Sequence, residues 1–129
     1  MTARRKRVLI VDDATLVRAY YRQALERAGY DVDEAMNGVE GLEKVLMHPF
    51  DLAVVDVNMP QMDGMTFIRT LRSKELPISA IATLVTSTEA REQDVAAARK
   101  AGANYYLTKP ISQERLIEHV VLLCGAHDG

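Results

Sequence analysis

The chain has 129 residues, of which 48% are hydrophobic, and it carries 16 Lys and Arg against 18 Asp and Glu. This length and charge balance predict one globular domain with its own core and exclude a second domain. The single cysteine, Cys124, cannot form an internal disulfide, so a reducing cytoplasm is the expected compartment. Short apolar runs argue against a membrane span or signal peptide, and a net charge of −2 argues against nucleic acid as a partner.

Strand and helix patterns alternate five times along the chain. The strands are short apolar runs, and the helices repeat apolar residues every three or four positions up to stops such as Gly29 and Gly102. Strands are predicted at 8–11, 31–35, 52–55, 78–85 and 103–107. Helices are predicted at 16–28, 37–48, 65–72, 89–101 and 112–123. We interpret the basic residues before the first strand, within 1–6, as a short lead-in.

This alternation predicts the α/β class, because parallel neighbouring strands need crossover helices. We expect a flavodoxin-like, doubly wound sheet of five parallel strands in the order 2-1-3-4-5, with helices on both faces. The second strand carries Asp31, Asp33 and Glu34, and so many charges favour a place at the sheet edge.

Polar residues follow four of the five predicted strands: Asp12 and Asp13, Asp56, Thr86, and Lys109. In an open α/β sheet these strand ends border the ligand crevice. Three converging carboxylates repel one another unless a cation lies among them, and Mg²⁺ prefers such oxygen ligands. Asp13 and Asp56 are expected to bind directly and Asp12 through water.

The same residues suit phosphoryl chemistry. Asp56 is placed to act as a nucleophile and become an acyl phosphate, with Mg²⁺ and Lys109 neutralising the charge of the transfer. Taken singly, Asp13 could cap the following helix and Lys109 could be an ordinary solvated residue. Their joint placement at one sheet edge favours a functional site.

Four motifs, in order, resemble the receiver domain of bacterial two-component response regulators over essentially the whole chain. They are Val11-Asp12-Asp13, Val55 to Pro60 with Asp63-Gly64, Val85-Thr86-Ser87, and Tyr106 to Pro110. The resemblance implies that Asp56 accepts a phosphoryl group from a sensor histidine kinase. It also implies that Asp12, Asp13, Asp56 and the backbone carbonyl of Asn58 hold Mg²⁺, for which Mn²⁺ can substitute.

The resemblance further implies a switch. Lys109 pairs with the phosphoryl group, Thr86 reorients toward it, and Tyr106 swings inward, which alters the face formed by the fourth helix, fifth strand and fifth helix. For Tyr106, the residue pattern alone favours simple packing. The Lys109-Pro110 bond is cis in the family.

Since the chain ends after the fifth helix, we expect a stand-alone receiver of the chemotaxis type without an output domain. Its expected partners are the kinase, a target such as a flagellar switch component, and a phosphatase. It is not expected to be an enzyme beyond its own phosphorylation and dephosphorylation. A phosphorelay intermediate, a phosphate sink and a degenerate binding module that is not phosphorylated remain alternatives.

Two other function classes fit less well. A phosphatase with an aspartate nucleophile needs a carboxylate at position 58, where Asn58 stands, and a nucleotide or flavin binder needs a glycine-rich loop after the first strand. Thr88 stands where chemotaxis receivers often have an acidic residue, which leaves the phosphoryl lifetime open. The histidines at 48, 119 and 127 show no ligand spacing, and Cys124 is expected to pack.

Overall fold

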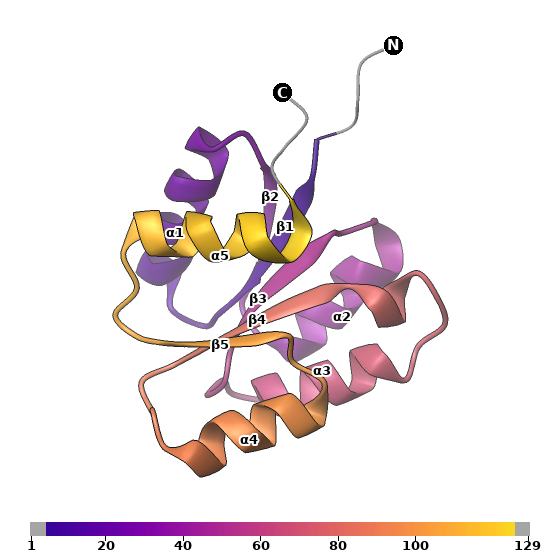
Figure 1. Ribbon diagram of the computed structural model, residues 1–129. Coiled ribbons are helices and arrows are strands. Elements are labelled where there is room, and N and C mark those ends of the chain that lie inside the picture. The colour runs from indigo at the N-terminus through magenta and orange to yellow at the C-terminus, as the bar shows by residue number, and fades with distance from the viewer. Residues whose placement is uncertain (1–4, 126–129) are drawn as a thin grey trace.

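The computed structural model describes residues 5–125, so part of the predicted basic lead-in and His127 lie outside the described residues. Five parallel strands form one sheet in the order β2-β1-β3-β4-β5, which confirms the predicted topology (Figure 1). The strands are β1 (Arg7–Val11), β2 (Asp31–Ala35), β3 (Leu52–Asp56), β4 (Ala82–Ser87) and β5 (Tyr105–Thr108). The helices are α1 (Thr15–Arg27), α2 (Gly38–Met47), α3 (Gly64–Arg72), the short 3-10 helix η1 (Ile78–Ala80), α4 (Glu92–Ala101) and α5 (Gln113–Cys124).

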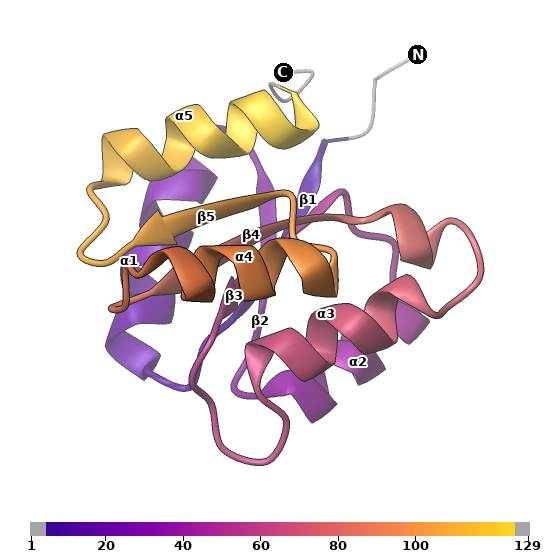
Figure 2. The ribbon, with the colours of Figure 1, turned by 60° about the horizontal axis from the view of Figure 1, so that its bottom comes forward.

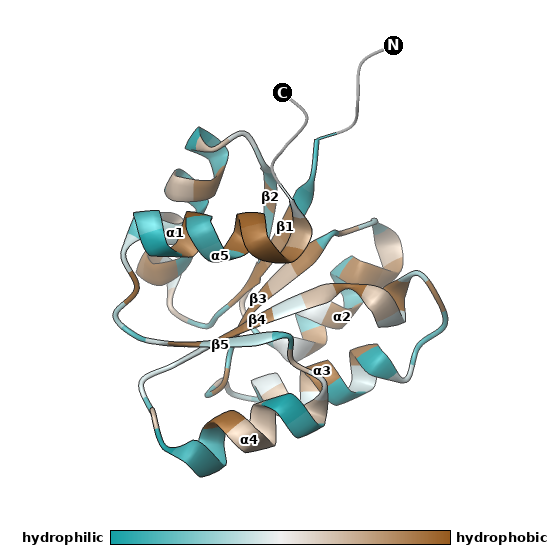
Figure 3. Cartoon of the chain, in the orientation of Figure 1, coloured by the Kyte–Doolittle hydropathy of each residue, from teal (hydrophilic) through white to brown (hydrophobic). Residues whose placement is uncertain are grey.

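The sheet separates two buried cores. Alternate strand residues such as Ile10 and Val54 face α1 and α5, whereas their neighbours, such as Val11 and Val55, face α2, α3 and α4. Figure 3 shows the hydrophobic residues concentrated on the inner strands, while α4 carries hydrophilic residues on its outer turns. None of the helices within residues 5–125 is long and apolar enough to cross a membrane.

The polar strand β2 lies at the sheet edge, as its charges predict. Glu34 accepts hydrogen bonds from Arg18 at 2.9 Å and from Arg22 at 2.6 Å, and Lys44 contacts Asp33 at 3.0 Å. These half-buried ion pairs cover the free edge with charge, which disfavours pairing with another chain.

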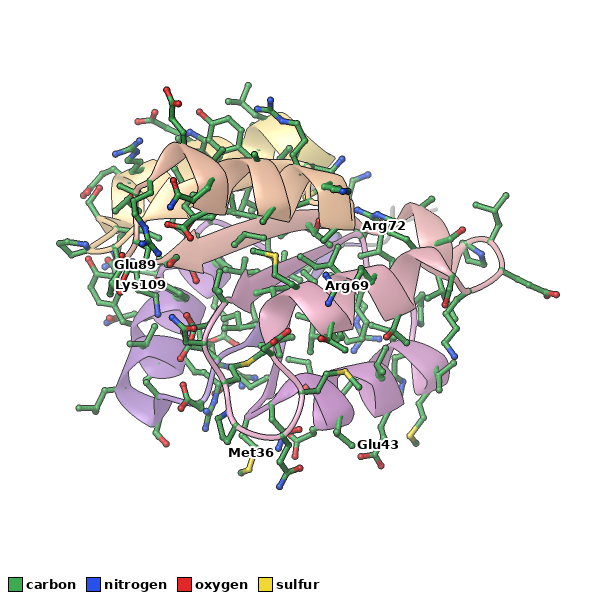
Figure 4. All side chains as sticks on the ribbon, turned by 90° about the horizontal axis from the view of Figure 1, so that it is seen from below. Met36, Glu43, Arg69, Arg72, Glu89 and Lys109 are labelled. Atoms are coloured by element: carbon green, nitrogen blue, oxygen red, sulfur yellow. The ribbon has the colours of Figure 1, made fainter. Side chains whose placement is uncertain are left out.

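The predicted start of the fourth strand is wrong, because residues 78–80 form η1 and β4 begins only at Ala82. The Arg72 guanidinium explains the difference. It donates hydrogen bonds to the carbonyl oxygens of Ser79 at 3.0 Å and Ile81 at 2.7 Å, which leaves these oxygens directed away from a sheet neighbour. Arg72 also bonds to the Gly102 carbonyl at the end of α4 (Figure 4 labels Arg72 on α3).

Two other elements begin two or three residues later than predicted. Helix α4 begins at Glu92 and not at position 89, because the Ser87 hydroxyl accepts the Glu89 amide at 3.0 Å and holds a turn there. Strand β5 begins at Tyr105 and not at 103, since the Asn104 side chain accepts the Thr83 amide at 2.8 Å. Figures 1 and 2 show β5 running between α4 and α5.

Candidate functional site

Four of the predicted site residues lie at the carboxyl ends of the strands and on one face of the sheet. Each follows, by two positions, a core residue that faces α1 and α5, and side chains two apart on a strand point the same way. The pairs are Ile10 and Asp12, Val54 and Asp56, Leu84 and Thr86, and Leu107 and Lys109. Asp56 and Thr86 are also register partners on β3 and β4. The topology therefore brings together residues from four strand ends.

Lys109 connects the site across the sheet. Its Nζ donates hydrogen bonds to Asp12 Oδ2 at 3.1 Å and to Asp56 Oδ1 at 3.2 Å. Its backbone amide donates to the Ser87 carbonyl at 2.6 Å, which fixes the start of the side chain beside β4. Figure 4 labels Lys109 beside Glu89 at this edge of the molecule. Lys109 is thus a positioned cation and not a solvated surface residue.

Three carboxylates meet at this cation. Asp12, Asp13 and Asp56 each offer an oxygen atom within 4.8 Å of the others, and among residues 5–125 they form the one such cluster of metal-ligating groups. Asp12 is 1% exposed and Asp56 is buried, whereas Asp13 is exposed. Asp12 Oδ1 accepts the Ala14 amide at 2.9 Å, and no side chain caps α1, so Asp13 does not act as its N-cap.

The charges act strongly on one another. Burial and the Asp12 carboxylate raise the pKa of Asp56, and the contact with Lys109 only partly opposes this rise. Burial would lower the pKa of Lys109, but Asp12 and Asp56 together raise it above its ordinary value. Lys109 therefore stays charged at neutral pH, and Asp56 is less acidic than a free aspartate.

The donor set fits a hard divalent cation. Three ionised carboxylates and one ammonium leave two negative charges without a counterion in a partly buried site, and all the facing donors are oxygen atoms. A divalent ion such as Mg²⁺ balances this charge and takes such ligands. Asn58 has an exposed side chain two residues beyond Asp56, and its role as a carbonyl ligand stays a prediction.

The two predicted switch residues lie at the same end of the sheet. Thr86 is fully buried, and its Oγ1 has no hydrogen-bond partner within the described part of the chain. Tyr106 is half-buried against the core under α4, and its hydroxyl donates to the Glu89 carbonyl at 2.7 Å. The Lys109-Pro110 bond is cis, as the resemblance implies. Movement of Thr86 and Tyr106 stays a prediction.

One residue of this region was missed from the sequence. Within the predicted helix at 16–28, Leu16 and Tyr20 are 84% and 43% exposed, whereas Tyr21 is 2% exposed and lines a hollow with Lys109. Burial raises the pKa of Tyr21 to about 12, with Lys109 the largest opposing influence. The signal was present, because Tyr21 lies three and four residues before the buried Ala24 and Leu25.

The remaining candidates take no part in the site. The His119 ring lies 4.8 Å from the Tyr105 ring, and its Nδ1 contacts the Arg115 carbonyl at 2.8 Å. Cys124 is partly buried at the end of α5, and burial raises its pKa to about 11. Both residues lie on α5 and contact no residue of the carboxylate cluster. Cys124 packs against the core between the sheet, α1 and α5, as expected.

Comparison with known sequences gives a consistent result. A family model for the response regulator receiver domain matches residues 8–121. The chain is 36% identical over 128 residues to the chemotaxis protein CheY1 of Helicobacter pylori, a match that covers 95% of this chain and 99% of that protein. It is 39% identical over 115 residues to the sensor protein EvgS of Escherichia coli, covering 88% of this chain and 9% of that protein.

Solved structures agree with these sequences. The chemotaxis protein CheY4 of Vibrio cholerae superposes with a TM-score of 0.86 at 31% identity, covering 92% of this chain and 98% of that one. A CheY-like response regulator receiver domain protein of Methanospirillum hungatei gives a TM-score of 0.82 at 31% identity, covering 89% and 90%. With its sheet order, its carboxylate cluster and these similarities, the chain belongs to the response regulator receiver domain family of two-component systems.

Proposed function

We propose that this chain is a single-domain response regulator, spanning residues 1–129, that accepts a phosphoryl group on Asp56. Receiver domains are signalling modules that take phosphoryl groups from histidine kinases. The observation that carries the proposal is the position of Asp56 at the end of β3, with Lys109 at 3.2 Å and two further carboxylates within 4.8 Å. This arrangement supports phosphoryl transfer, because the site offers both a nucleophile and the means to balance charge.

Asp12, Asp13, Asp56 and the backbone carbonyl of Asn58 would hold Mg²⁺, and Mn²⁺ accepts the same oxygen donors. When bound, such an ion neutralises charge on the phosphoryl oxygens. The Asp12 carboxylate is oriented for this role, because the Ala14 amide fixes one of its oxygens and Lys109 the other.

In the transfer step, an Asp56 carboxylate oxygen attacks the phosphorus of a phosphohistidine. The new O–P bond forms as the N–P bond breaks, and the imidazole nitrogen leaves with the bonding electrons. Lys109 needs only a short shift from Asp56 Oδ1 to a phosphoryl oxygen, because its Nζ already contacts that carboxylate. Asp12 keeps its contact with Lys109 throughout and so orients the ammonium.

The switch follows from the two residues next to this chemistry. Thr86 is the register partner of Asp56, and its unpartnered hydroxyl is free to turn to a phosphoryl oxygen. Tyr106 pairs with Val85, the residue before Thr86, and its hydroxyl contact with Glu89 ties β5 to the loop before α4. We expect this change to alter the face of α4, β5 and α5, which Figure 2 shows together.

The expected setting is the cytoplasm, with a sensor histidine kinase as donor and a chemotaxis or flagellar motor component as target. Similarity over 99% of the length of CheY1 supports the chemotaxis role. A relay role has its own support, because a stretch 39% identical to this chain over 115 residues is part of the sensor protein EvgS. The two roles differ in whether the acyl phosphate is passed on to a second histidine.

Intact-mass analysis after incubation with acetyl phosphate tests the proposal. We expect a gain of one phosphoryl group in the presence of Mg²⁺, no gain with a chelator, and no gain for Asp56→Asn. Asp63→Asn is a matched control, because Asp63 lies in the same loop but its side chain accepts the Thr66 amide as the N-cap of α3. Labelling of Asp56→Asn at the native level would contradict the assignment.

A further inference from the structure

Tyr21 reaches from α1 to the candidate phosphoryl site. Its ring is buried in the core between the sheet, α1 and α5. The residue also lines a hollow of about 550 Å³ together with Thr88 and Lys109. Because Lys109 also contacts Asp12 and Asp56, this hollow borders the carboxylate cluster, and the charges of all three residues influence the pKa of Tyr21.

Thr86 provides an independent observation. Its Oγ1 is buried and has no hydrogen-bond partner within residues 5–125. Thr86 lies two residues after Leu84, which packs in the same core as Tyr21, so the Thr86 side chain lies on the face of the sheet that Tyr21 covers. The influence of the Thr86 hydroxyl on the pKa of Tyr21 agrees with this placement, although the two hydroxyls do not form a hydrogen bond. Buried hydroxyls are nearly always hydrogen-bonded, so an unpartnered one points to a ligand or a movement that satisfies it.

We infer that Tyr21 is a positioning residue of the phosphoryl site: when Thr86 turns its hydrogen to a phosphoryl oxygen on Asp56, the Tyr21 hydroxyl donates a hydrogen bond to Thr86 Oγ1. This inference rests on the proposed function of Asp56. A threonine hydroxyl donates one hydrogen and accepts others, so both bonds can form at once. The result is a chain from Tyr21 through Thr86 to the phosphoryl group, in which each bond strengthens the next.

The protonation of Tyr21 agrees with this role. Burial raises its pKa to about 12, so the phenol keeps its proton at neutral pH and can donate it to the Thr86 oxygen. Additional negative charge on Asp56 acts in the same direction, as Asp56 already raises the Tyr21 pKa. The phenol therefore remains a donor after phosphorylation.

Tyr30 is the matched control. It is also 2% exposed, burial raises its pKa to about 12, and its hydroxyl donates to the Gly125 carbonyl at 2.8 Å, away from the site. The Tyr30→Phe variant therefore removes a buried hydroxyl without affecting Thr86.

The test measures the affinity for beryllium fluoride, a stable stand-in for the phosphoryl group, by isothermal titration calorimetry in Mg²⁺. We expect Tyr21→Phe to weaken binding about fivefold, the change that corresponds to one net hydrogen bond. Tyr30→Phe should bind as the native chain does. In a Thr86→Ala background Tyr21→Phe should cause no further loss, and in a Thr86→Ser background, which keeps the hydroxyl, the fivefold loss should return.

The outcomes separate the two proposals. If the native chain binds beryllium fluoride but Tyr21→Phe binds equally well, or loses the same affinity in the Thr86→Ala background, the role of Tyr21 is overturned and Asp56 keeps its assignment. An equal loss for Tyr30→Phe would also overturn it, since the effect would then come from stability. If the native chain neither binds beryllium fluoride nor gains mass with acetyl phosphate, the proposed function falls and this inference falls with it.

Discussion

Asp56→Asn is expected to raise the free energy of unfolding when no divalent cation is present. Burial and Asp12 raise the pKa of Asp56, so the folded state holds this proton more tightly than the unfolded chain does. The Asp56 contribution to the unfolding free energy therefore falls as the pH rises from the ordinary value of 3.8 through the raised native pKa. The side-chain amide of the Asp56→Asn variant carries no charge at any pH, so the variant does not lose this unfolding free energy as the pH rises.

The magnitude follows from opposing contacts. Repulsion between Asp56 and Asp12, whose oxygens lie within 4.8 Å, amounts to about 3.5 kcal/mol at an effective dielectric constant of about 20. Attraction to Lys109 at 3.2 Å contributes about 5 kcal/mol on the same scale. Desolvation of a buried carboxylate opposes folding by several kcal/mol more. Together these contributions disfavour a charged Asp56 in the folded state. We therefore expect Asp56→Asn to raise the free energy of unfolding by about 1 kcal/mol.

Urea unfolding at pH 7, with a chelator and with Mg²⁺, measures this effect. Mg²⁺ at one hundred times its Kd adds about 2.7 kcal/mol to a native state that binds it, so the native chain should become the more stable of the two. Asp31→Asn is the matched control, because Asp31 is half-exposed on β2 and its 3.9 Å contact with Arg5 lies far from the site. It should change the unfolding free energy by less than about 0.5 kcal/mol and keep the Mg²⁺ effect.

Two results would refute this reasoning. If Asp56→Asn were less stable than the native chain in chelator, the attraction to Lys109 would outweigh burial and repulsion together. If Mg²⁺ stabilised both chains equally, Asp56 would not contribute to cation binding. A pH series adds a further check, because the difference between the two chains should shrink below pH 3.8 and grow above it.

Three further substitutions test the packing and the edge of the sheet. A Cβ on Gly64 would overlap the Asp56 carbonyl oxygen, so Gly64→Ala should lower the unfolding free energy by about 1–3 kcal/mol, and an unchanged thermal midpoint would contradict this contact. Arg72→Lys loses the guanidinium bonds to three carbonyls, so amide exchange at 102–104 should accelerate about tenfold; unaltered exchange would show that this segment does not depend on Arg72. Burial would raise the pKa of Glu34, but Arg18 and Arg22 on α1 lower it below its ordinary value. The charged Glu34 therefore stabilises the fold above pH 4.5, and this stabilisation is lost as the pH falls through the native pKa. Glu34→Gln should therefore destabilise by about 1 kcal/mol at pH 7 but not at pH 2 in urea unfolding, and an equal loss at both would exclude the ion pairs as the cause.

The fold and the composition of the site could be predicted from the sequence because both depend on short-range patterns. Apolar runs identify the strands, and the parallel crossover rule sets their common direction. Once the strands are known, the residues that follow them, such as Asp12, Asp56 and Lys109, must meet at one edge. Two-residue periodicity then also fixes the face on which they lie.

What could not be predicted depends on contacts between distant residues. The start of β4 is set by Arg72, which lies seven and nine residues before the carbonyls of Ser79 and Ile81 that it binds. No local pattern shows that a partly buried arginine will bind backbone carbonyls in place of a carboxylate. The proposed role of Tyr21 could not be predicted for a different reason. The helical pattern of a buried aromatic residue is the same whether or not its hydroxyl is directed at a site.

The Lys109 contacts also have a consequence for the order in which the protein folds. Lys109 and Asp12 are 97 residues apart in the chain, and Lys109 and Asp56 are 53 apart, so the ammonium joins the first, third and fifth structural units. Contacts of such long range form only after most of the chain has been brought into order. The Lys109 contacts are therefore a late property of folding, and a partly synthesised or truncated chain that lacks the residues after the fourth strand cannot form them. The arrangement of charges at this edge thus depends on a complete and ordered domain.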